Sequence, residues 1–318
     1  MITGGAGFIG SNLAIRLVED GAKVTILDAM LPEYGGNLFN LEPIRDKVNI
    51  NFSDMRDKSS LSYLVKGKDY IFNLAGQVSH QDSMVNPFLD LEINITAQLT
   101  LLEECRQHAP DAVILYASTR QLYGRPEYLP VDERHLVSPP DVNGINKLAA
   151  EQYHTLYFKV HGLKTVSLRL TNTYGPRQLI KNARQGFIGW FANRALLGET
   201  IQLFGTGEQV RDFTYVDDVV NAFCLASATP KCYGNFYNLG GERATLKEVA
   251  TLLTQYSDKG SIDIVPFPEE RKKIDIGDFY GNYDKFTADT GWEPQIGLTI
   301  GLKQMIDYYT VNQEFYLG

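Results

Sequence analysis

The segment TGGAGFIGSNL (residues 3–13) places three glycines between a short apolar run and a helical pattern. Gly4, Gly7 and Gly10 follow the spacing G-x-x-G-x-x-G. At a strand-to-helix turn, such glycines permit positive φ, let a pyrophosphate approach the backbone and let the helix pack closely on the sheet. The amides and the positive dipole end of that helix then attract phosphate groups. The segment predicts a phosphate-binding turn, although a glycine pattern alone also fits a simple tight turn.

Outward from this turn, the first two-thirds of the chain alternate short apolar runs with amphipathic helical segments. We predict strands at 1–3, 23–27, 49–52, 70–74, 112–117 and 165–170, and helices at 8–20, 59–66, 91–108 and 146–161. Alternation of this kind indicates a parallel sheet with right-handed crossovers. We therefore expect an α/β fold built on a doubly wound parallel sheet of the Rossmann type.

A carboxylate supports the nucleotide interpretation of the glycine turn. Asp28 ends the second predicted strand, 18 residues after Gly10. A carboxylate at that place accepts both ribose hydroxyls of an adenosine and repels a 2′-phosphate, which favours NAD over NADP. The alternative is that Asp28 caps the following loop. Asp54, after the third predicted strand, is placed to contact the adenine edge or to serve as a helix N-cap.

The pattern changes after residue 170. Residues 174–182 are rich in Gly, Pro and polar side chains, 199–217 predict two strands around a glycine turn, and 298–309 predict a helix. We expect residues 1–170 to form the NAD-binding domain. Residues 171–318 should form mainly a substrate lobe over the carboxyl ends of the strands, with some segments returning to the first domain. The first predicted strand is unusually short, so the chain start is either trimmed or mis-assigned.

Composition narrows the classes of function. The 318 residues are 44% hydrophobic and 21% charged, and the formal net charge is −8, which disfavours binding to nucleic acid. Three cysteines without CxxC spacing argue against a disulfide framework and a thiolate zinc site. No metal-ligand spacing, signal peptide or apolar stretch of about 20 residues stands out. We expect a cytoplasmic protein that binds no metal and no membrane.

Further motifs, read together, resemble the extended short-chain dehydrogenase/reductase family, whose members are nucleotide-sugar epimerases and dehydratases. These motifs are NLAGQVSHQDSMVNP (73–87), ASTRQLYG (117–124), NKLAAEQ (146–152), RLTNTYGPRQ (169–178) and GEQVRDFTYVDDVV (207–220). Parts of the chain, among them RQGFIGWF at 184–191, look most like CDP-tyvelose (paratose) 2-epimerases. The resemblance covers nearly the whole chain and is more specific for the family than for the reaction.

The resemblance implies that NAD is held tightly and used catalytically. A sugar hydroxyl is oxidised to a ketone, chemistry takes place on the activated intermediate, and the hydride is returned. The residues expected to bind the cofactor are Gly4, Gly7, Phe8, Ile9, Gly10, Asp28, Asp54, Met55, Leu74, Ala75 and Lys147.

The expected catalytic set departs from the family in one essential residue. Family members use a Ser or Thr together with a Tyr-x-x-x-Lys motif, whose lysine depresses the tyrosine pKa and holds the nicotinamide ribose. Thr119 and Lys147 match, but the tyrosine position is Asn143. An amide can hydrogen-bond a substrate hydroxyl but cannot take its proton. Either another group is the base, or the first oxidation is slow or absent.

A second departure concerns dehydration. In the 4,6-dehydratases of the family, an Asp-Glu pair follows the threonine and performs the elimination of water. Arg120 and Gln121 stand at those positions, and neither can act as that acid/base pair. The usual dehydratase chemistry is therefore not expected.

His80 is the candidate to replace the tyrosine, with Thr119 and Asn143 as hydrogen-bonding partners. It lies in the loop after the fourth predicted strand, which faces the sugar in this fold, and an imidazole pKa of about 6.5 suits proton transfer. The alternative is a partly exposed loop histidine with no catalytic part. Tyr123, in the YG turn common to the family, is expected to be structural.

Substrate binding requires cations for a nucleoside diphosphate. Arg211 matches the family arginine directed at the diphosphate or nucleoside, Asn172 matches a phosphate-contacting asparagine, and Arg271 roughly matches a second arginine, with a solvated surface position as its alternative. Arg120 is suited to stabilise an alkoxide or enolate, or to face a phosphate or the surface. Phe187, Trp190 and Phe191 have helical spacing and are expected to pack between lobes rather than to face a nucleobase.

The leading hypothesis is an NAD-dependent nucleotide-sugar epimerase with non-standard acid/base groups. One alternative is a dehydratase or ketoreductase for a related sugar nucleotide, and another is an NAD-binding protein with weakened or lost catalysis. Related proteins pair the helices that correspond to 91–108 and 146–161 across a two-fold axis, so the resemblance implies a homodimer.

Overall fold

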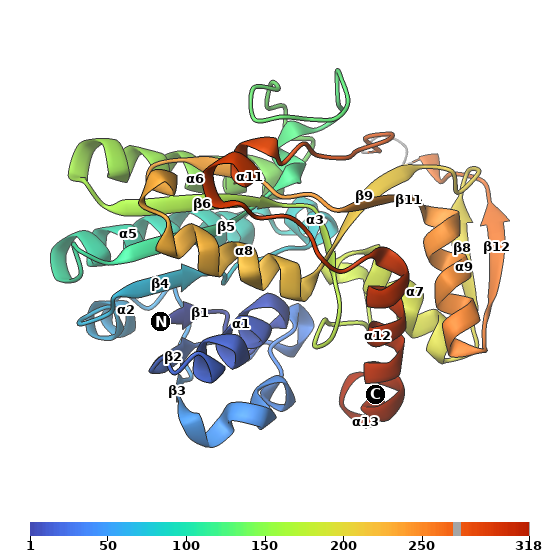
Figure 1. The fold of residues 1–318 in the computed structure, drawn as a ribbon, viewed down its shortest axis with the longest axis horizontal. Helices are drawn as coiled ribbons and strands as arrows, with labels where there is room; N and C mark the ends of the chain where they lie inside the picture. Colours follow the sequence, from blue (N-terminus) through green and yellow to red (C-terminus); the bar gives the residue numbers. More distant parts are fainter. Residues whose placement is uncertain (270–274, 318) are drawn as a thin grey trace.

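The central layer is a seven-stranded parallel sheet in the order β10-β6-β5-β4-β1-β2-β3 (Figure 1). The computed structural model describes residues 1–269 and 275–317. The strands are β1 (Ile2–Thr3), β2 (Val24–Leu27), β3 (Val48–Asn51), β4 (Tyr70–Asn73), β5 (Val113–Thr119), β6 (Lys164–Leu170) and β10 (Phe236–Asn238). The expected doubly wound α/β fold is confirmed.

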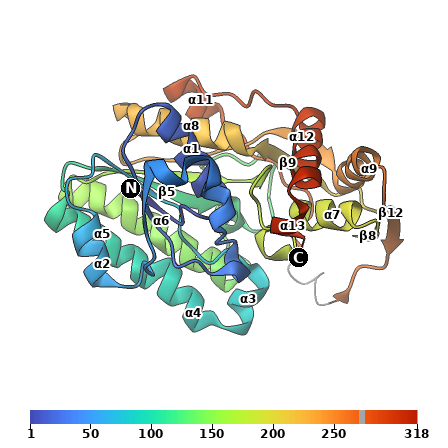
Figure 2. The ribbon, with the colours of Figure 1, turned by 90° about the horizontal axis from the view of Figure 1, so that it is seen from below.

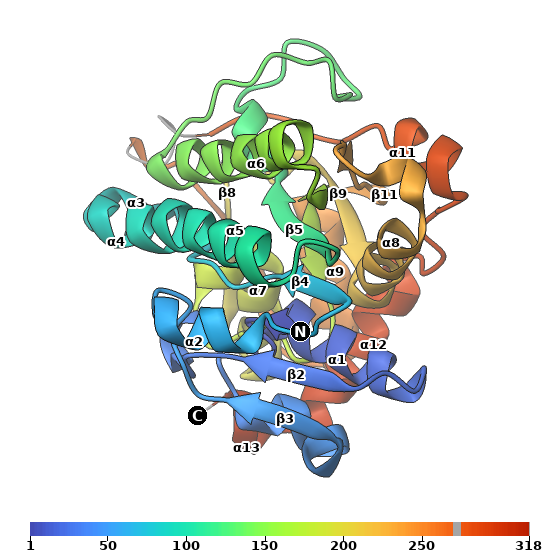
Figure 3. The same cartoon turned by 90° about the vertical axis from the view of Figure 1, so that its left-hand side faces the viewer.

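Helices cover both faces of this sheet, as Figures 2 and 3 show. One face carries α2 (Lys58–Leu64), α5 (Ala97–His108) and α6 (Val142–His161), and the other carries α1 (Phe8–Glu19), α8 (Val216–Ala228) and α11 (Asp284–Thr290). Each face has its own apolar core, built on alternate side chains of the same strands: Ile114 faces one core and Leu115 the other. The sheet is therefore buried on both sides, as its β-rich runs predict.

A smaller lobe lies beside the carboxyl ends of the strands (Figure 1). It contains a three-stranded sheet of β11 (Glu242–Thr245), β9 (Val210–Tyr215) and β7 (Asn172–Tyr174), and a pair formed by β12 (Ser261–Val265) and β8 (Thr200–Phe204). Its helices are α7 (Phe187–Leu196), α9 (Leu246–Ser257), α12 (Leu298–Val311) and α13 (Gln313–Tyr316). Because β10 pairs with β6, the chain returns to the large sheet after residue 170. The proposed domain boundary at residue 170 stays a prediction.

Two helices differ from the sequence prediction. The segment 91–108 is not one helix: α4 (Pro87–Leu91) leads through a π-helical turn at Glu92–Thr96 into α5. Helix α6 begins at Val142 rather than at 146, because the Asp141 side chain caps it by accepting a 2.7 Å hydrogen bond from the Gly144 amide. Gly144 weakens the helical pattern there, so the periodicity indicates too late a start.

Short elements complete the fold. They are α3 (His80–Val85) and the 3₁₀ helices η1 (Pro32–Tyr34), η2 (Leu38–Lys47), η4 (Arg120–Tyr123), η5 (Ala183–Gln185) and η6 (Pro230–Cys232). Within residues 1–269 and 275–317, no helix has both the length and the apolar character needed to cross a membrane.

Candidate active site

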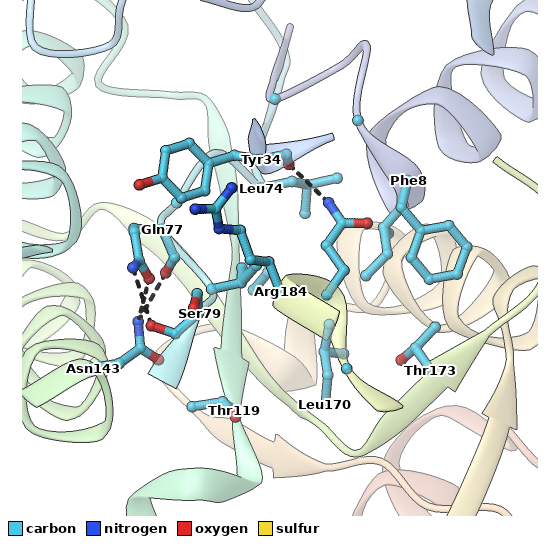
Figure 4. A pocket seen from close by; sticks show the side chains of 18 of the residues that line it. Phe8, Tyr34, Leu74, Gln77, Ser79, Thr119, Asn143, Leu170, Thr173 and Arg184 are labelled. Carbon is cyan, nitrogen blue, oxygen red and sulfur yellow. Dashed lines mark hydrogen bonds between the residues drawn. The ribbon is translucent and has the colours of Figure 1, made fainter. Parts of the chain in front are cut away.

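A cavity of about 960 Å³ opens where the carboxyl ends of β1 to β6 meet the smaller lobe. Figure 4 shows part of its lining, with Phe8 on one side and Asn143 on the other. The sequence-predicted residues that line it are Gly4, Gly7, Phe8, Ile9, Gly10, Asp28, Asp54, Met55, Leu74, Ala75, His80, Thr119, Arg120, Asn143, Lys147 and Asn172. The fold thus brings them to one place, while their individual roles stay predictions.

The glycine turn has the geometry that a dinucleotide needs. Gly4 has a φ of +68°, and a Cβ at Gly10 would lie 2.2 Å from the Gly4 carbonyl oxygen. No side chain fits at Gly10, so α1 approaches the end of β1 as closely as two backbones allow. Gly7 is the N-cap of α1 and offers no side-chain cap, so the amides of the first helical turn are left for a ligand such as a phosphate.

Asp28 ties the glycine turn to the loop after β2. Its Oδ2 accepts a 2.9 Å hydrogen bond from the Ala6 amide and its Oδ1 a 2.8 Å bond from the Met30 amide. Burial raises the pKa of Asp28, and these two amides oppose that rise. A carboxylate offers about four acceptor sites, so two remain for the ribose hydroxyls of NAD. The residue fits the cofactor and also shapes its cradle.

Asp54 is occupied by a neighbour. Its Oδ2 lies 2.7 Å from Arg56 Nη2, and Arg56 also contacts Glu92 at 3.1 Å. The hydrogen bonds from Arg56 outweigh burial and lower the pKa of Asp54. The alternative that Asp54 caps α2 is wrong, because Asp57 is the N-cap residue. A contact between Asp54 and adenine stays a prediction.

Lys147 reaches the inner end of the cavity from α6. Its Nζ donates a 3.2 Å hydrogen bond to the Ala117 carbonyl and lies 5.1 Å from the centre of the Tyr116 ring. Burial lowers the pKa of Lys147 to about 8, against the opposing charge of Asp90. Thr119 ends β5 on the same side, and its Oγ1 accepts a 3.1 Å bond from the Gln121 amide.

Asn143, at the expected tyrosine position, is part of a buried polar cluster. Its Nδ2 donates to the Gln77 carbonyl at 2.8 Å (Figure 4) and to Asp90 Oδ2 at 3.0 Å. Asp90 also accepts a 2.7 Å bond from Asn146. The amide donors of Asn143 therefore hold α6 against α4, and only its Oδ1 is left to meet a substrate.

The sequence analysis placed His80 in a loop, and this is wrong. His80 is the first residue of α3, directly after the N-cap Ser79. Its Nδ1 is 3.0 Å from Asp141 Oδ2. The His80 side chain is 41% exposed, whereas that of Asp141 is 1% exposed. A half-open imidazole against a buried carboxylate, on the wall of a cavity, is an arrangement suited to proton transfer.

Tyr123 is built into the interior. Its hydroxyl donates a 2.7 Å hydrogen bond to Asn238 Oδ1, and its side chain does not line the cavity. Burial raises the pKa of Tyr123 to about 12, although Arg169 opposes that rise. The structural role expected for Tyr123 agrees with this position.

Two arginines, Arg120 and Arg211, bring positive charge to the walls of the main cavity and of a second cavity. Arg120 lines the main cavity, and its Nη1 is buried without a hydrogen-bond partner among the described residues. Burial and the neighbouring charge of Arg211 lower the pKa of Arg120 to about 10. Asn172 donates to the Asp212 carbonyl at 2.9 Å. Arg271 lies outside the described residues, so its predicted contact is neither supported nor contradicted.

Arg211 faces a second cavity of about 380 Å³ that adjoins the first. Its Nη1 donates to the carbonyls of Val210 and Gly277. Phe187 and Trp190 line this second cavity and are only partly buried, whereas Phe191 also belongs to the core of the smaller lobe. Phe191 is therefore packed inside the smaller lobe rather than between lobes, and the other two rings both line the cavity and pack against that core.

The segment around Arg184 and Gln185, which the sequence analysis did not assign to the site, lines the main cavity. Gln185 Nε2 donates to the Tyr34 carbonyl at 2.8 Å (Figure 4), and Arg184 pairs with Asp82 at 2.8 Å. Asp141 was missed as well. The sequence offered one indication: an Asp just before a helical pattern is a typical N-cap, and Asp141 stands four residues before Ile145. Gly144 weakens that pattern and so hides the start of the helix.

The profile of the NAD dependent epimerase/dehydratase family matches residues 1–240. The match spans most of the chain, and the chain belongs to this family. The family resemblance found in the sequence is thereby confirmed. NAD is the cofactor of this family, and the cradle around Gly10 and Asp28 fits it.

Individual relatives carry more specific names. The chain is 30% identical to CDP-paratose 2-epimerase of Salmonella typhi, over 97% of this chain and 98% of the relative. It is 31% identical to UDP-glucose 4-epimerase of Mycolicibacterium smegmatis, over 97% of both. The crystal structure of UDP-glucose 4-epimerase with UDP-glucose from Thermotoga maritima superposes with a TM-score of 0.88, at 31% identity and with 98% of both chains covered.

Replacing Asp28 tests the cofactor cradle. In Asp28→Asn one carboxylate acceptor becomes a donor facing an amide, and a charge-assisted bond to the ribose is lost, so we expect NAD to bind about tenfold more weakly or worse. The measurement is the NAD content of purified protein and titration of the stripped protein. Asp111→Asn, at an exposed position, is the control. Equal NAD retention by Asp28→Asn and wild type would contradict the assignment.

Proposed function

We propose that the protein is a nucleotide-sugar epimerase that inverts a sugar carbon by transient oxidation and reduction. The observation that carries the proposal is that a dinucleotide cradle, Lys147, Thr119, Arg120 and His80 line one cavity, and that His80 is paired there with the buried carboxylate of Asp141. The names of the two 30–31% identical relatives, both epimerases for nucleotide sugars, support it.

The chain's own residues account for the binding steps. The first turn of α1 and Asp28 hold the dinucleotide, and Lys147 donates to its nicotinamide ribose. When bound, NAD supplies a reversible hydride acceptor. Arg211 pairs with the diphosphate of the substrate, and the second cavity beside Phe187 and Trp190 is the proposed place for the nucleobase.

His80 is the proposed base. It takes the proton of the sugar hydroxyl during oxidation and gives it back during reduction, so no net proton is consumed. Thr119 donates a hydrogen bond to the same oxygen, and Asn143 Oδ1 accepts one from a neighbouring hydroxyl. Arg120, whose Nη1 has no hydrogen-bond partner among the described residues, stabilises negative charge that develops on the sugar oxygen.

Dehydration is disfavoured by the contacts of residue 121. Gln121 Nε2 donates a 3.0 Å hydrogen bond to Asp141, so the amide holds a carboxylate, and an amide does not act as an acid or a base near neutral pH. Arg120 remains charged at neutral pH, because its lowered pKa of about 10 is still far above 7. Neither residue provides the acid or the base for loss of water.

A panel of nucleotide sugars tests the proposed reaction. The protein is incubated with UDP-, CDP-, dTDP- and GDP-sugars, and products are separated while absorbance at the NADH band is followed. We expect one sugar nucleotide to equilibrate with an epimer, with NADH transient and no net reduction, because the hydride is returned. A keto-deoxy product would establish a dehydratase instead, and bound NAD without turnover on any sugar would establish a binding protein.

The base is tested by His80→Gln, which keeps a polar side chain but removes the proton acceptor. We expect kcat to fall by about 10²–10⁴-fold with NAD content unchanged, because general base catalysis contributes that range. His108→Gln, on α5 and away from the cavity, should keep wild-type turnover. Wild-type turnover in His80→Gln would exclude His80 as the base.

The same family relationship leads us to propose a homodimer through α5 and α6. These helices lie side by side on the outer face of the large domain (Figure 3). Leu156 and Val160 on α6 are 48% and 62% exposed, which leaves apolar surface uncovered in a single chain. We expect sedimentation at micromolar concentration to give a dimer and Leu156→Glu to shift it towards monomer. A wild-type monomer would contradict the proposal.

A further inference from the structure

The Asp141 side chain is held by contacts from three elements. Oδ1 accepts a 2.7 Å hydrogen bond from the Gly144 amide in the first turn of α6. Oδ2 accepts a 3.0 Å bond from Gln121 Nε2 of η4 and lies 3.0 Å from His80 Nδ1 of α3. With 1% of the side chain exposed, the carboxylate has little freedom to turn away from the imidazole.

His80 Nδ1 and Asp141 Oδ2 lie within ion-pair distance without forming a well-directed hydrogen bond, so Asp141 acts on the tautomer of His80 through its charge. A carboxylate beside Nδ1 favours a proton on Nδ1, and the neutral ring then offers its lone pair at Nε2. Burial opposes ionisation of Asp141, but His80, the Gly144 amide and Gln121 together hold the pKa of its carboxyl below its usual value. Asp141 is therefore a charged carboxylate at neutral pH.

We propose that Asp141 is the positioning residue of this enzyme: it keeps the His80 proton on Nδ1 and presents Nε2 to the substrate as the proton acceptor, with Gln121 as its anchor. The inference rests on the proposed function, in which His80 is the base. It adds that Nε2 is the atom that takes the proton, and that Asp141 and Gln121 hold the ring in the tautomer that leaves Nε2 free to do so.

The proton balance closes within this group. His80 Nε2 takes the proton of the sugar hydroxyl, and bound NAD would supply the acceptor for the hydride from the carbon that carries this hydroxyl. The imidazolium that forms is stabilised by the Asp141 charge, and the proton returns to the sugar oxygen when the carbonyl is reduced. Asp141 keeps its charge throughout and is not itself protonated.

The pairing gives a physical reason for both departures from the family. A glutamate at 121 would put a second negative charge against Asp141 Oδ2, where Gln121 now donates a hydrogen bond. Asn143 is engaged with Asp90 and Gln77, so proton transfer at that position is given up. In this proposal His80, on the neighbouring wall of the cavity, does the acid/base work that a tyrosine at position 143 does in the family.

The other charged groups near this wall are accounted for. Asp82, on α3 itself, pairs with Arg184 from η5, and Arg120 of η4 and Lys147 of α6 line the same cavity. Asp90 of α4 is bonded to two asparagines. Among the described residues, Asp141 is the one carboxylate within ion-pair distance of His80.

The test is Asp141→Asn, with Asp57→Asn as the matched control. Both residues are N-caps, and asparagine caps as well as aspartate, so each helix start is preserved. For Asp141→Asn we expect kcat to fall about 10–100-fold with KM within about twofold, because a base in the wrong tautomer cannot accept the proton.

A merely structural role would give a different result. If Asp141→Asn keeps the wild-type kcat while His80→Gln loses turnover, Asp141 is only a helix cap and the inference fails alone. If His80→Gln keeps full turnover, the proposed base fails and the inference falls with it. Should Asp141→Asn lose NAD or melt early, Gln121→Met replaces it: loosening the anchor should lower kcat several-fold, and an unchanged kcat would overturn the anchoring role.

Discussion

The close approach of α1 to the end of β1 is the constraint on which the site depends. A Cβ at Gly10 would lie 2.2 Å from the Gly4 carbonyl oxygen, so this contact exists only without a side chain. It places the uncapped amides of α1 at the carboxyl edge of the sheet, and Asp28 locks the turn through the Ala6 amide. The other walls, from β4, β5 and α6, are arranged around the space that this turn leaves open.

Local patterns made the cofactor half of the site predictable, because its residues follow strand ends that periodicity finds. Gly4 and Asp28 each come directly after a predicted strand and Thr119 lies two residues after one, and parallel strands bring such ends to one edge. The His80–Asp141 contact joins positions 61 residues apart and depends on the exact start of α6. Periodicity places helix ends within a few residues only, so it could not show that Asp141 caps this helix and meets α3.

Asn143, at the position where the family resemblance predicts a tyrosine, connects the wall of the cavity to α3. Its backbone amide donates to Ser83 Oγ at 3.2 Å, and that hydroxyl donates to the His80 carbonyl at 2.7 Å. The residue at the tyrosine position is thus connected through one hydroxyl to the helix that carries the histidine. Together with the bonds to Gln77 and Asp90, this makes residue 143 a support for α3 and α4 rather than an acid or a base.

This arrangement explains how a short helix can hold the imidazole of the proposed base in place. Helix α3 spans six residues, too few to be stable by itself in water. It is held at its start by the contact between Asp141 and His80, near its middle by Ser83 against Asn143, and at its outer side by Asp82 against Arg184. Two of these three contacts come from residues 141–143 at the first turn of α6, the helix that also carries Lys147. The helix that carries Lys147 therefore also supports α3 and the proposed base at its start.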